Sequence, residues 1–137
     1  MDKTIAGGCA CGAVRYRTDA APNVMLNCHC RDCQRASGSA FAAITVVPQA
    51  SVAIEGTPRF HTVTADSGNA VERGFCPSCG SPLFVKLARL PEILGLAAGS
   101  LDDPARHQPS LDVFTDSAQA WCALSDATKK FPRAVTR

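Results

Sequence analysis

The sequence FCPSCGS, residues 75–81, holds a CxxC motif formed by Cys76 and Cys79. In such a knuckle the backbone turns so that both thiolates point at one ion, and a glycine after the second cysteine, here Gly80, suits the left-handed conformation that closes the turn. A redox dithiol is the alternative, but that motif typically starts a helix in a βαβ unit. Here a serine, a proline and a β-type run follow, so the pattern favours a metal site.

The matching pair lies near the N-terminus, in GGCACG, residues 7–12. Cys9 and Cys11 form a CxC motif with a glycine on each side, which allows the backbone to fold around an ion. A closed structural zinc site needs four ligands, and a CxxC supplies only two. The sequence therefore predicts one zinc held by both pairs, which would clip the N-terminal segment to the middle of the chain.

A third group of cysteines lies in NCHCRDCQ, residues 27–34. Cys28 and Cys30 face the same way if the segment is extended, and Cys33 joins them if a short helix begins at Cys30. Three ligands and an open position are typical of catalytic zinc. The positive end of the helix is expected to lower the thiol pKa values, and this ion is expected to be the more exposed of the two.

The remaining candidate side chains are expected to support or cover the structure rather than to bind metal or take part in catalysis. His29 lies between two ligating cysteines, so its ring should point to the opposite face, which favours a supporting role over direct ligation. Cys122 is expected to pack as a small hydrophobe beside Trp121. His61 and His107 are interpreted as ordinary surface or hairpin residues.

The composition and net charge limit the kinds of protein and partner that are expected for this chain. The chain has 137 residues, of which 46% are hydrophobic and 19% charged, as expected for one globular domain. A net charge of +2 argues against a nucleic-acid partner. The N-terminus lacks a signal-peptide pattern and no apolar run is long enough to span a bilayer, so we expect no membrane partner, a cytoplasmic location and reduced cysteines. A disulfide framework is the alternative for the eight cysteines.

Short β-type runs bounded by turn residues recur along the chain, and they predict a mainly β domain over residues 1–137. The runs cover residues 13–17, 24–26, 41–47, 51–54, 59–63, 71–75, 82–87, 93–97 and 111–114. Residues 55–58 are interpreted as a hairpin turn between two of them. Two short segments, 30–37 and 104–107, look helical.

The three motifs together carry a family resemblance. GGCACGAVRY, NCHCRDCQRASGSAF and SGNAVERGFCPSCGSPLF, in this order, resemble the glutathione-dependent formaldehyde-activating family, and the tail VFTDSAQAWCALSDATKKFP is similar to that family's C-terminal segment. The resemblance implies a β-tent fold: two stacked antiparallel sheets with zinc-binding loops. It also implies two Zn²⁺ per chain, a structural ion and a catalytic ion. The implied structural ligands are Cys9, Cys11, Cys76 and Cys79, and the implied catalytic ligands are Cys28, Cys30 and Cys33.

The activity implied by the resemblance is that of a carbon–sulfur lyase, which joins glutathione to formaldehyde and gives S-hydroxymethylglutathione. A zinc with three thiolates would hold a thiol or polarise an aldehyde, both of which suit this reaction. Arg31, Arg35 and Arg73 are candidates for the glutathione carboxylates, because a guanidinium matches a carboxylate bidentately. The alternative is that these arginines are solvated surface charges. The oligomeric state is left open.

Two other functions are weighed. A methionine sulfoxide reductase of the B type has a similar fold and a four-cysteine zinc, but it uses two CxxC pairs and a separate reactive cysteine. A non-catalytic zinc module that binds a protein or nucleic acid would need a fourth protein ligand at the second site. The sequence departs from the resembling family at residues 121–123, Trp-Cys-Ala, where relatives often carry an aromatic after the tryptophan.

Overall fold

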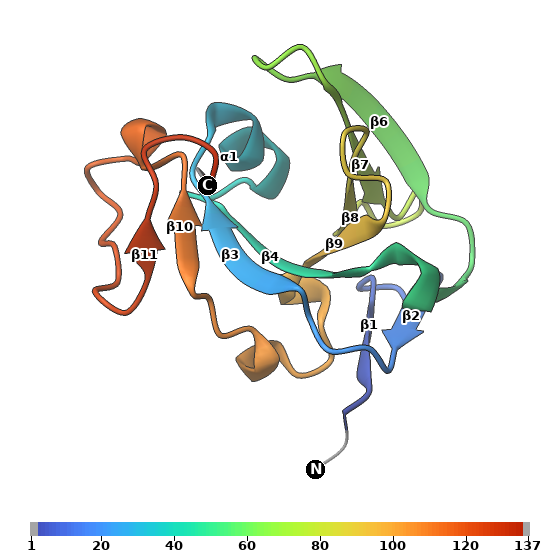
Figure 1. The fold of residues 1–137 in the computed structure, drawn as a ribbon. Coiled ribbons are helices and arrows are strands. Elements are labelled where there is room, and N and C mark those ends of the chain that lie inside the picture. Colours follow the sequence, from blue (N-terminus) through green and yellow to red (C-terminus); the bar gives the residue numbers. More distant parts are fainter. Residues whose placement is uncertain (1–2, 136–137) are drawn as a thin grey trace.

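Two β-sheets form the framework of the computed structural model, which describes residues 3–135 (Figure 1). The smaller sheet has the order β1-β2-β5 and the larger sheet the order β11-β10-β3-β4-β9-β8-β7-β6. The strands are β1 Ile5–Gly8, β2 Arg15–Thr18, β3 Val24–Cys28, β4 Ala42–Pro48, β5 Ala53–Glu55, β6 Arg59–Thr64, β7 Ala70–Phe75, β8 Pro82–Leu87, β9 Ile93–Ala97, β10 Leu111–Val113 and β11 Lys129–Lys130. The prediction of a mainly β fold with two sheets is confirmed.

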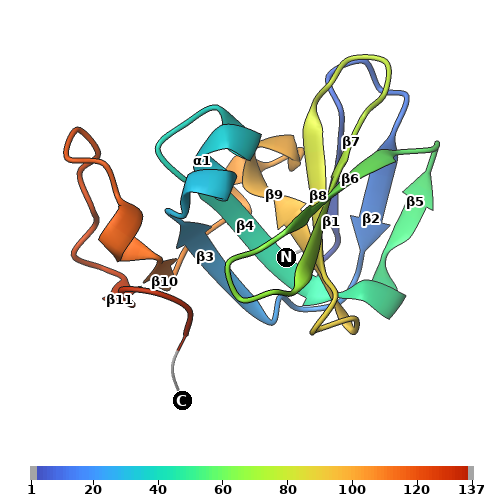
Figure 2. The ribbon, with the colours of Figure 1, turned by 90° about the horizontal axis from the view of Figure 1, so that it is seen from above.

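Strand β10 departs from the antiparallel arrangement, because it pairs in parallel with both β3 and β11. The strands on the other side of β3 follow one another antiparallel. After β9 the chain runs through two short 3-10 turns, Ala98–Ser100 and Pro104–Arg106, before it enters β10. This connection brings β10 alongside β3 in the same direction. Figure 2 shows β10 and β11 at the opposite end of the molecule from the smaller sheet.

The interpretation of residues 55–58 as a hairpin turn is wrong. Strand β5 pairs with β2 in the smaller sheet, whereas β6 pairs with β7 in the larger one, so the turn carries the chain from one sheet to the other. Gly56 has φ 86°, and a Cβ atom there would lie 2.1 Å from the carbonyl oxygen of Ala13. The turn therefore packs closely on the segment that leads into β2, and only glycine fits.

Helix α1, Arg31–Ser37, begins within the third cysteine segment, as predicted. Cys30 is its N-cap and Gly38, with φ 66°, ends it by donating its backbone N–H to the carbonyl of Gln34 at 2.9 Å. The other expected helical segment, 104–107, is only a 3-10 turn. Two further 3-10 turns cover Gln49–Ser51 and Thr115–Ser117. Within residues 3–135, no helix is long and apolar enough to cross a membrane.

Two hydrophobic clusters support the cysteine groups. The first fills the space between the sheets with Tyr16 from β2 and with Leu83, Phe84 and Leu96 from β8 and β9. Cys9 and Cys76 belong to this cluster. The second cluster lies beneath α1 and β3 and holds Cys28, Cys33, Ile44, Val46, Val113 and Phe131. Each cysteine group is therefore anchored in its own part of the core.

Candidate metal centres and the cavity beside them

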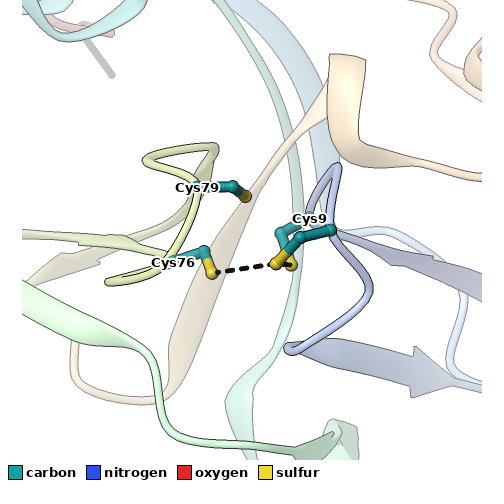
Figure 3. A group of neighbouring side chains, drawn as sticks. Cys9, Cys76 and Cys79 are labelled. Atoms are coloured by element: carbon teal, nitrogen blue, oxygen red, sulfur yellow. Dashed lines mark hydrogen bonds between the residues drawn. The ribbon is translucent and has the colours of Figure 1, made fainter.

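The two loops that carry the predicted structural ligands meet in space (Figure 3). Cys9 and Cys11 come from the loop after β1, and Cys76 and Cys79 come from the loop after β7. These residues, the four-cysteine group, have all their sulfur atoms within 4.8 Å of one another. The Sγ–Sγ distance is 3.6 Å from Cys9 to Cys11 and 3.7 Å from Cys11 to Cys76. Tetrahedral zinc with bonds of about 2.3 Å places its sulfurs roughly 3.8 Å apart, so the group fits zinc.

Backbone and hydroxyl groups support these sulfurs. The N–H of Val14 donates to Cys9 Sγ at 3.2 Å, and the hydroxyl of Ser81 lies 3.2 Å from Cys79 Sγ. Hydrogen bonds from Ser81 lower the pKa of Cys79 to about 5. Gly80 adopts φ 79° and donates its N–H to the carbonyl of Cys76 at 2.8 Å, which closes the CxxC turn as expected. A backbone hydrogen bond at Ala13 lowers the pKa of Cys11, but the thiols of Cys9, Cys76 and Cys79 outweigh it and raise that pKa to about 11, so the loops favour the thiolate at some of these sulfurs and not at all of them.

The second set of ligand candidates, the three-cysteine group, consists of Cys28, Cys30 and Cys33. Cys28 ends β3, Cys30 caps α1, and Cys33 lies one helical turn further on. Their sulfur atoms also lie within 4.8 Å of one another, and no further Cys, His, Asp or Glu among residues 3–135 belongs to the group. The N–H of Cys33 donates to Cys30 Sγ at 3.3 Å. Three sulfurs without a fourth protein ligand fit an open zinc site.

Two expectations about this group differ from the structure. Hydrogen bonds from the Cys28 and Cys33 thiols lower the pKa of Cys30, but the neighbouring thiols and burial raise the pKa of Cys28. The pKa is therefore lowered, as expected, only for Cys30 of these two thiols.

The three-cysteine group is also less exposed than the four-cysteine group, which is the opposite of the expectation. Cys28 and Cys33 are buried, whereas Cys11 and Cys79 in the four-cysteine group are exposed. The reason is that α1 and β3 both pack on the core.

His29 lies behind the three-cysteine group rather than in it. Its ring is 1% exposed, and Nε2 lies 2.6 Å from Oδ1 of Asp112, a side chain that also accepts a hydrogen bond from the hydroxyl of Thr128. The backbone of His29 is held as well, by the carbonyl of Val113 at 3.0 Å and by the amide of Gln34 at 2.7 Å. These bonds fix the extended segment between Cys28 and Cys30, which agrees with the supporting role predicted for His29.

Asp112→Asn is expected to destabilise the zinc-loaded protein by about 2–3 kcal/mol, because a buried charged acceptor with two donors is lost. Burial alone would raise the pKa of Asp112, but the bonds from His29 and Thr128 outweigh it and hold that pKa below its ordinary value. Urea unfolding measures the change. Asp126→Asn, an exposed site in the same C-terminal segment, is the matched control. Equal stability of the two variants would contradict this role.

One member of the three-cysteine group, Cys33, lies on the wall of a cavity of about 870 Å³, called here the main cavity. Cys33 and Arg73 line it, and Nη2 of Arg73 lies 3.6 Å from Cys33 Sγ. Arg15 and Asp102 line another part of its wall. Much of the remaining wall is made of small residues, including Ala42, Ala43, Gly74, Ala97 and Gly99. A cavity of this size accepts a small organic ligand.

Arg31 and Arg35 lie in a different place from Arg73. Both are exposed, and they line a shallow depression of about 390 Å³ together with Gln34, Gln119 and Trp121. Neither of these two arginines lines the main cavity with Cys33. Of the three arginines considered as carboxylate partners, the structure thus brings only Arg73 into contact with a candidate zinc ligand.

The expectations for Cys122 and His107 are wrong. Cys122 is only partly buried and Trp121 is 73% exposed, so the pair does not pack as a hydrophobic unit. His107 is not an ordinary surface residue, because Nδ1 lies 2.9 Å from Thr45 Oγ1 and Nε2 lies 3.2 Å from Asn27 Oδ1. Burial lowers its pKa. His61 is exposed, as expected, but it is paired with Arg73 across β6 and β7 and it also lines the main cavity.

Asp112 and the pair of Arg15 and Asp102 were not identified from the sequence. A signal for Asp112 exists, since a single charged residue interrupts the apolar run Leu-Asp-Val-Phe of residues 111–114. A charge on a buried strand calls for a partner. No comparable signal marks Arg15 or Asp102, which are 87 positions apart in the chain.

Comparisons with known proteins agree with this geometry. The sequence model of the family described as "Glutathione-dependent formaldehyde-activating enzyme" matches residues 4–117. A Halomonas elongata protein named "Putative glutathione-dependent formaldehyde-activating enzyme" is 30% identical over 108 residues, which cover 75% of this chain and 69% of that protein. The crystal structure of a Rhodobacter sphaeroides protein is similar in fold, with a TM-score of 0.57 at 20% identity over 74% of this chain and 93% of that one.

Proposed function

The chain belongs to the glutathione-dependent formaldehyde-activating enzyme family, and from this premise we propose that it is a zinc-dependent carbon–sulfur lyase. The proposed reaction joins glutathione, or a similar thiol, to formaldehyde or another small aldehyde. A bond forms between the thiol sulfur and the carbonyl carbon, the carbonyl oxygen takes the electron pair of its broken π bond, and the thiol proton ends on that oxygen. The product with formaldehyde is S-hydroxymethylglutathione.

Two Zn²⁺ ions per chain are part of the proposal. The four-cysteine group would hold a structural ion, since all four positions of a tetrahedral zinc are then filled by protein. The three-cysteine group would hold the catalytic ion, which, when bound, keeps a thiol sulfur deprotonated or polarises an aldehyde oxygen. The donor sets and the close approach of the sulfurs support both assignments.

The observation that carries the proposal is the position of Cys33, one member of the three-cysteine group, on the wall of the main cavity. Cys33 lies on the wall of a cavity large enough for a small organic thiol, beside the guanidinium of Arg73. Arg73 can neutralise negative charge on a ligand next to the sulfurs. The walls of this cavity, which is partly open to solvent, can hold two reactants next to each other, which is the contribution that an addition reaction needs most.

Arg31 and Arg35 are proposed to meet a carboxylate of the thiol from the neighbouring depression. Charge supports this role, because both residues are exposed arginines and both line this depression. The cytoplasm is the proposed location, since free cysteines and glutathione coexist in a reducing compartment.

The test of the proposed function is a rate, because glutathione and formaldehyde also combine without a catalyst. Exchange between free glutathione and its hydroxymethyl adduct can be followed by NMR at equilibrium. The exchange rate is expected to rise in proportion to the concentration of zinc-loaded protein. If the exchange rate of the mixture does not change when this protein is added, the lyase assignment fails.

Arg73→Gln is expected to lower the protein-dependent exchange rate by about tenfold or more, because a charge-assisted contact at the reaction site is lost. Zinc content should stay at the parent level, since Arg73 is not a ligand. Arg73→Lys should recover part of the rate by restoring the charge. Arg59→Gln, an exposed position on β6 that does not line the main cavity, is the matched control. A rate in Arg73→Gln equal to that of the control would contradict this role.

A further inference from the structure

We propose that Arg15 and Asp102, on the wall of the main cavity, bind the α-amino-acid end of a thiol ligand. For glutathione this is the γ-glutamyl end, which carries an ammonium and a carboxylate on one carbon. Asp102 would accept from the ammonium and Arg15 would donate to the carboxylate. The inference rests on the proposed function for the identity of the ligand, and it adds where the ligand's far end is recognised.

The two side chains form a bidentate pair at the cavity wall. Nη1 of Arg15 donates to Oδ1 of Asp102 at 2.9 Å, and Nη2 donates to Oδ2 at 2.5 Å. Both residues line the same cavity as Cys33 and Arg73. The side chains remain 42% and 52% exposed, respectively, so a ligand in the cavity can reach them.

Stabilisation of the fold does not account for this ion pair. The backbone already joins the segments, because the N–H of Asp102 donates to the carbonyl of Ala6 at 2.9 Å and Gly7 pairs with Leu101 in an isolated β-bridge. The hydroxyl of Tyr16 adds a side-chain contact to Ser100 at 2.6 Å. An ion pair that is about half exposed adds little to stability. Its position on the cavity wall therefore calls for another explanation.

Both groups are charged and keep free hydrogen-bonding capacity. Each holds the other ionised: the guanidinium lowers the pKa of Asp102, and the carboxylate raises the pKa of Arg15. A guanidinium has five N–H donors and a carboxylate about four acceptor positions, so the pair leaves several of each unused. An α-amino-acid group presents the opposite charges side by side, and it can bind without breaking the pair.

The arrangement selects for an extended thiol. Cys33 and Arg73 would meet the thiol end of the ligand, while Arg15 and Asp102 would meet its amino-acid end at another part of the wall. Alanine and glycine residues elsewhere on the wall keep the side chains short and leave room for the linking backbone. A short thiol without an amino-acid group would use only the first of these contacts and bind more weakly.

The experiment compares three ligands by calorimetric titration of the zinc-loaded protein. They are glutathione, an analogue without the α-amino group (glutaryl-Cys-Gly) and an analogue without the α-carboxylate (4-aminobutyryl-Cys-Gly). Wild-type protein should bind glutathione about tenfold more tightly than either analogue. Asp102→Asn should abolish the preference over the first analogue, and Arg15→Gln the preference over the second. Asp19→Asn, which removes a charge next to the exposed Arg17, should keep both preferences.

Equal binding of all three ligands to wild-type protein would overturn the inference, as would preferences that survive in both variants. If one variant does not fold, the other variant still tests its own half of the site, and equal binding of the three ligands to wild-type protein still overturns the inference. The outcome is independent of catalysis. Protein that shows the tenfold preference but no acceleration of exchange would keep this binding site and contradict the proposed reaction, whereas acceleration with equal binding of all three ligands would do the reverse.

Discussion

Replacing Cys76 with serine is expected to leave the protein unfolded or close to it at room temperature. Cys76 is fully buried, belongs to the core between the two sheets and lies 3.7 Å, sulfur to sulfur, from Cys11. A structural zinc contributes roughly 10 kcal/mol or more to folding. That is comparable to the whole stability of a domain, roughly 5–15 kcal/mol. Losing one of four ligands therefore removes most of what joins the β1 loop to the β7 loop.

Circular dichroism and thermal melting of purified protein test this result, with zinc content measured on the same samples. Cys122→Ser is the matched control, because Cys122 belongs to neither cysteine group and is only partly buried. This control should melt close to the parent temperature. A Cys76→Ser protein that melts like the control would show that the four-cysteine group does not stabilise the fold.

Cys30→Ser is expected to have the opposite profile, with the fold kept and the second zinc and all protein-dependent exchange lost. Serine is itself a good N-cap residue, so it can replace Cys30 at the start of α1. Cys28 and Cys33 remain in their hydrophobic cluster. Two thiolates without the third are a poor zinc site. The measurement is zinc per chain together with circular dichroism, and an unfolded Cys30→Ser protein would contradict the separation of the two sites.

Mild chelation of the wild-type protein tests the same separation without a mutation. The three-cysteine group should lose zinc first, because a chelator can take the open position before it displaces a protein ligand. Exposure of the sulfurs favours the reverse order, since Cys11 and Cys79 are the exposed thiols. We expect the number of protein ligands, rather than the exposure of the sulfurs, to determine which site loses zinc first. Simultaneous loss of both metals together with the fold would indicate one cooperative unit.

The three-cysteine group could be predicted from the sequence because its geometry is local, whereas Cys11 and Cys76 of the four-cysteine group are 65 positions apart and were joined by the number of ligands that zinc needs. Alternation along an extended segment brings Cys28 and Cys30 together, and one helical turn adds Cys33. Strands β8 and β9 match residues 82–87 and 93–97 as predicted, since both are apolar runs with clear turn residues at their ends. The family resemblance supplied the pairing of the two sheets, which no local pattern contains.

The features that could not be predicted depend on contacts between distant parts of the chain. Strand β1 is half glycine and was missed, because glycine has a low strand propensity. The turn at residues 55–58 has hairpin residues, yet its two flanking strands join different sheets. His29 and Asp112 are 83 positions apart. The main cavity likewise exists only once α1, β7 and the β1–β2 loop are packed together.

One protein sample in three metal states gives the most direct test of the proposal that the open three-cysteine site performs the reaction. Exchange between glutathione and its hydroxymethyl adduct is measured with two zinc ions per chain, after mild chelation to one, and after zinc is restored. Folding is followed by circular dichroism throughout. We expect the protein-dependent rate to disappear with the second zinc and to return with it, while the fold stays constant. An exchange rate that stays the same in all three states would contradict the proposal.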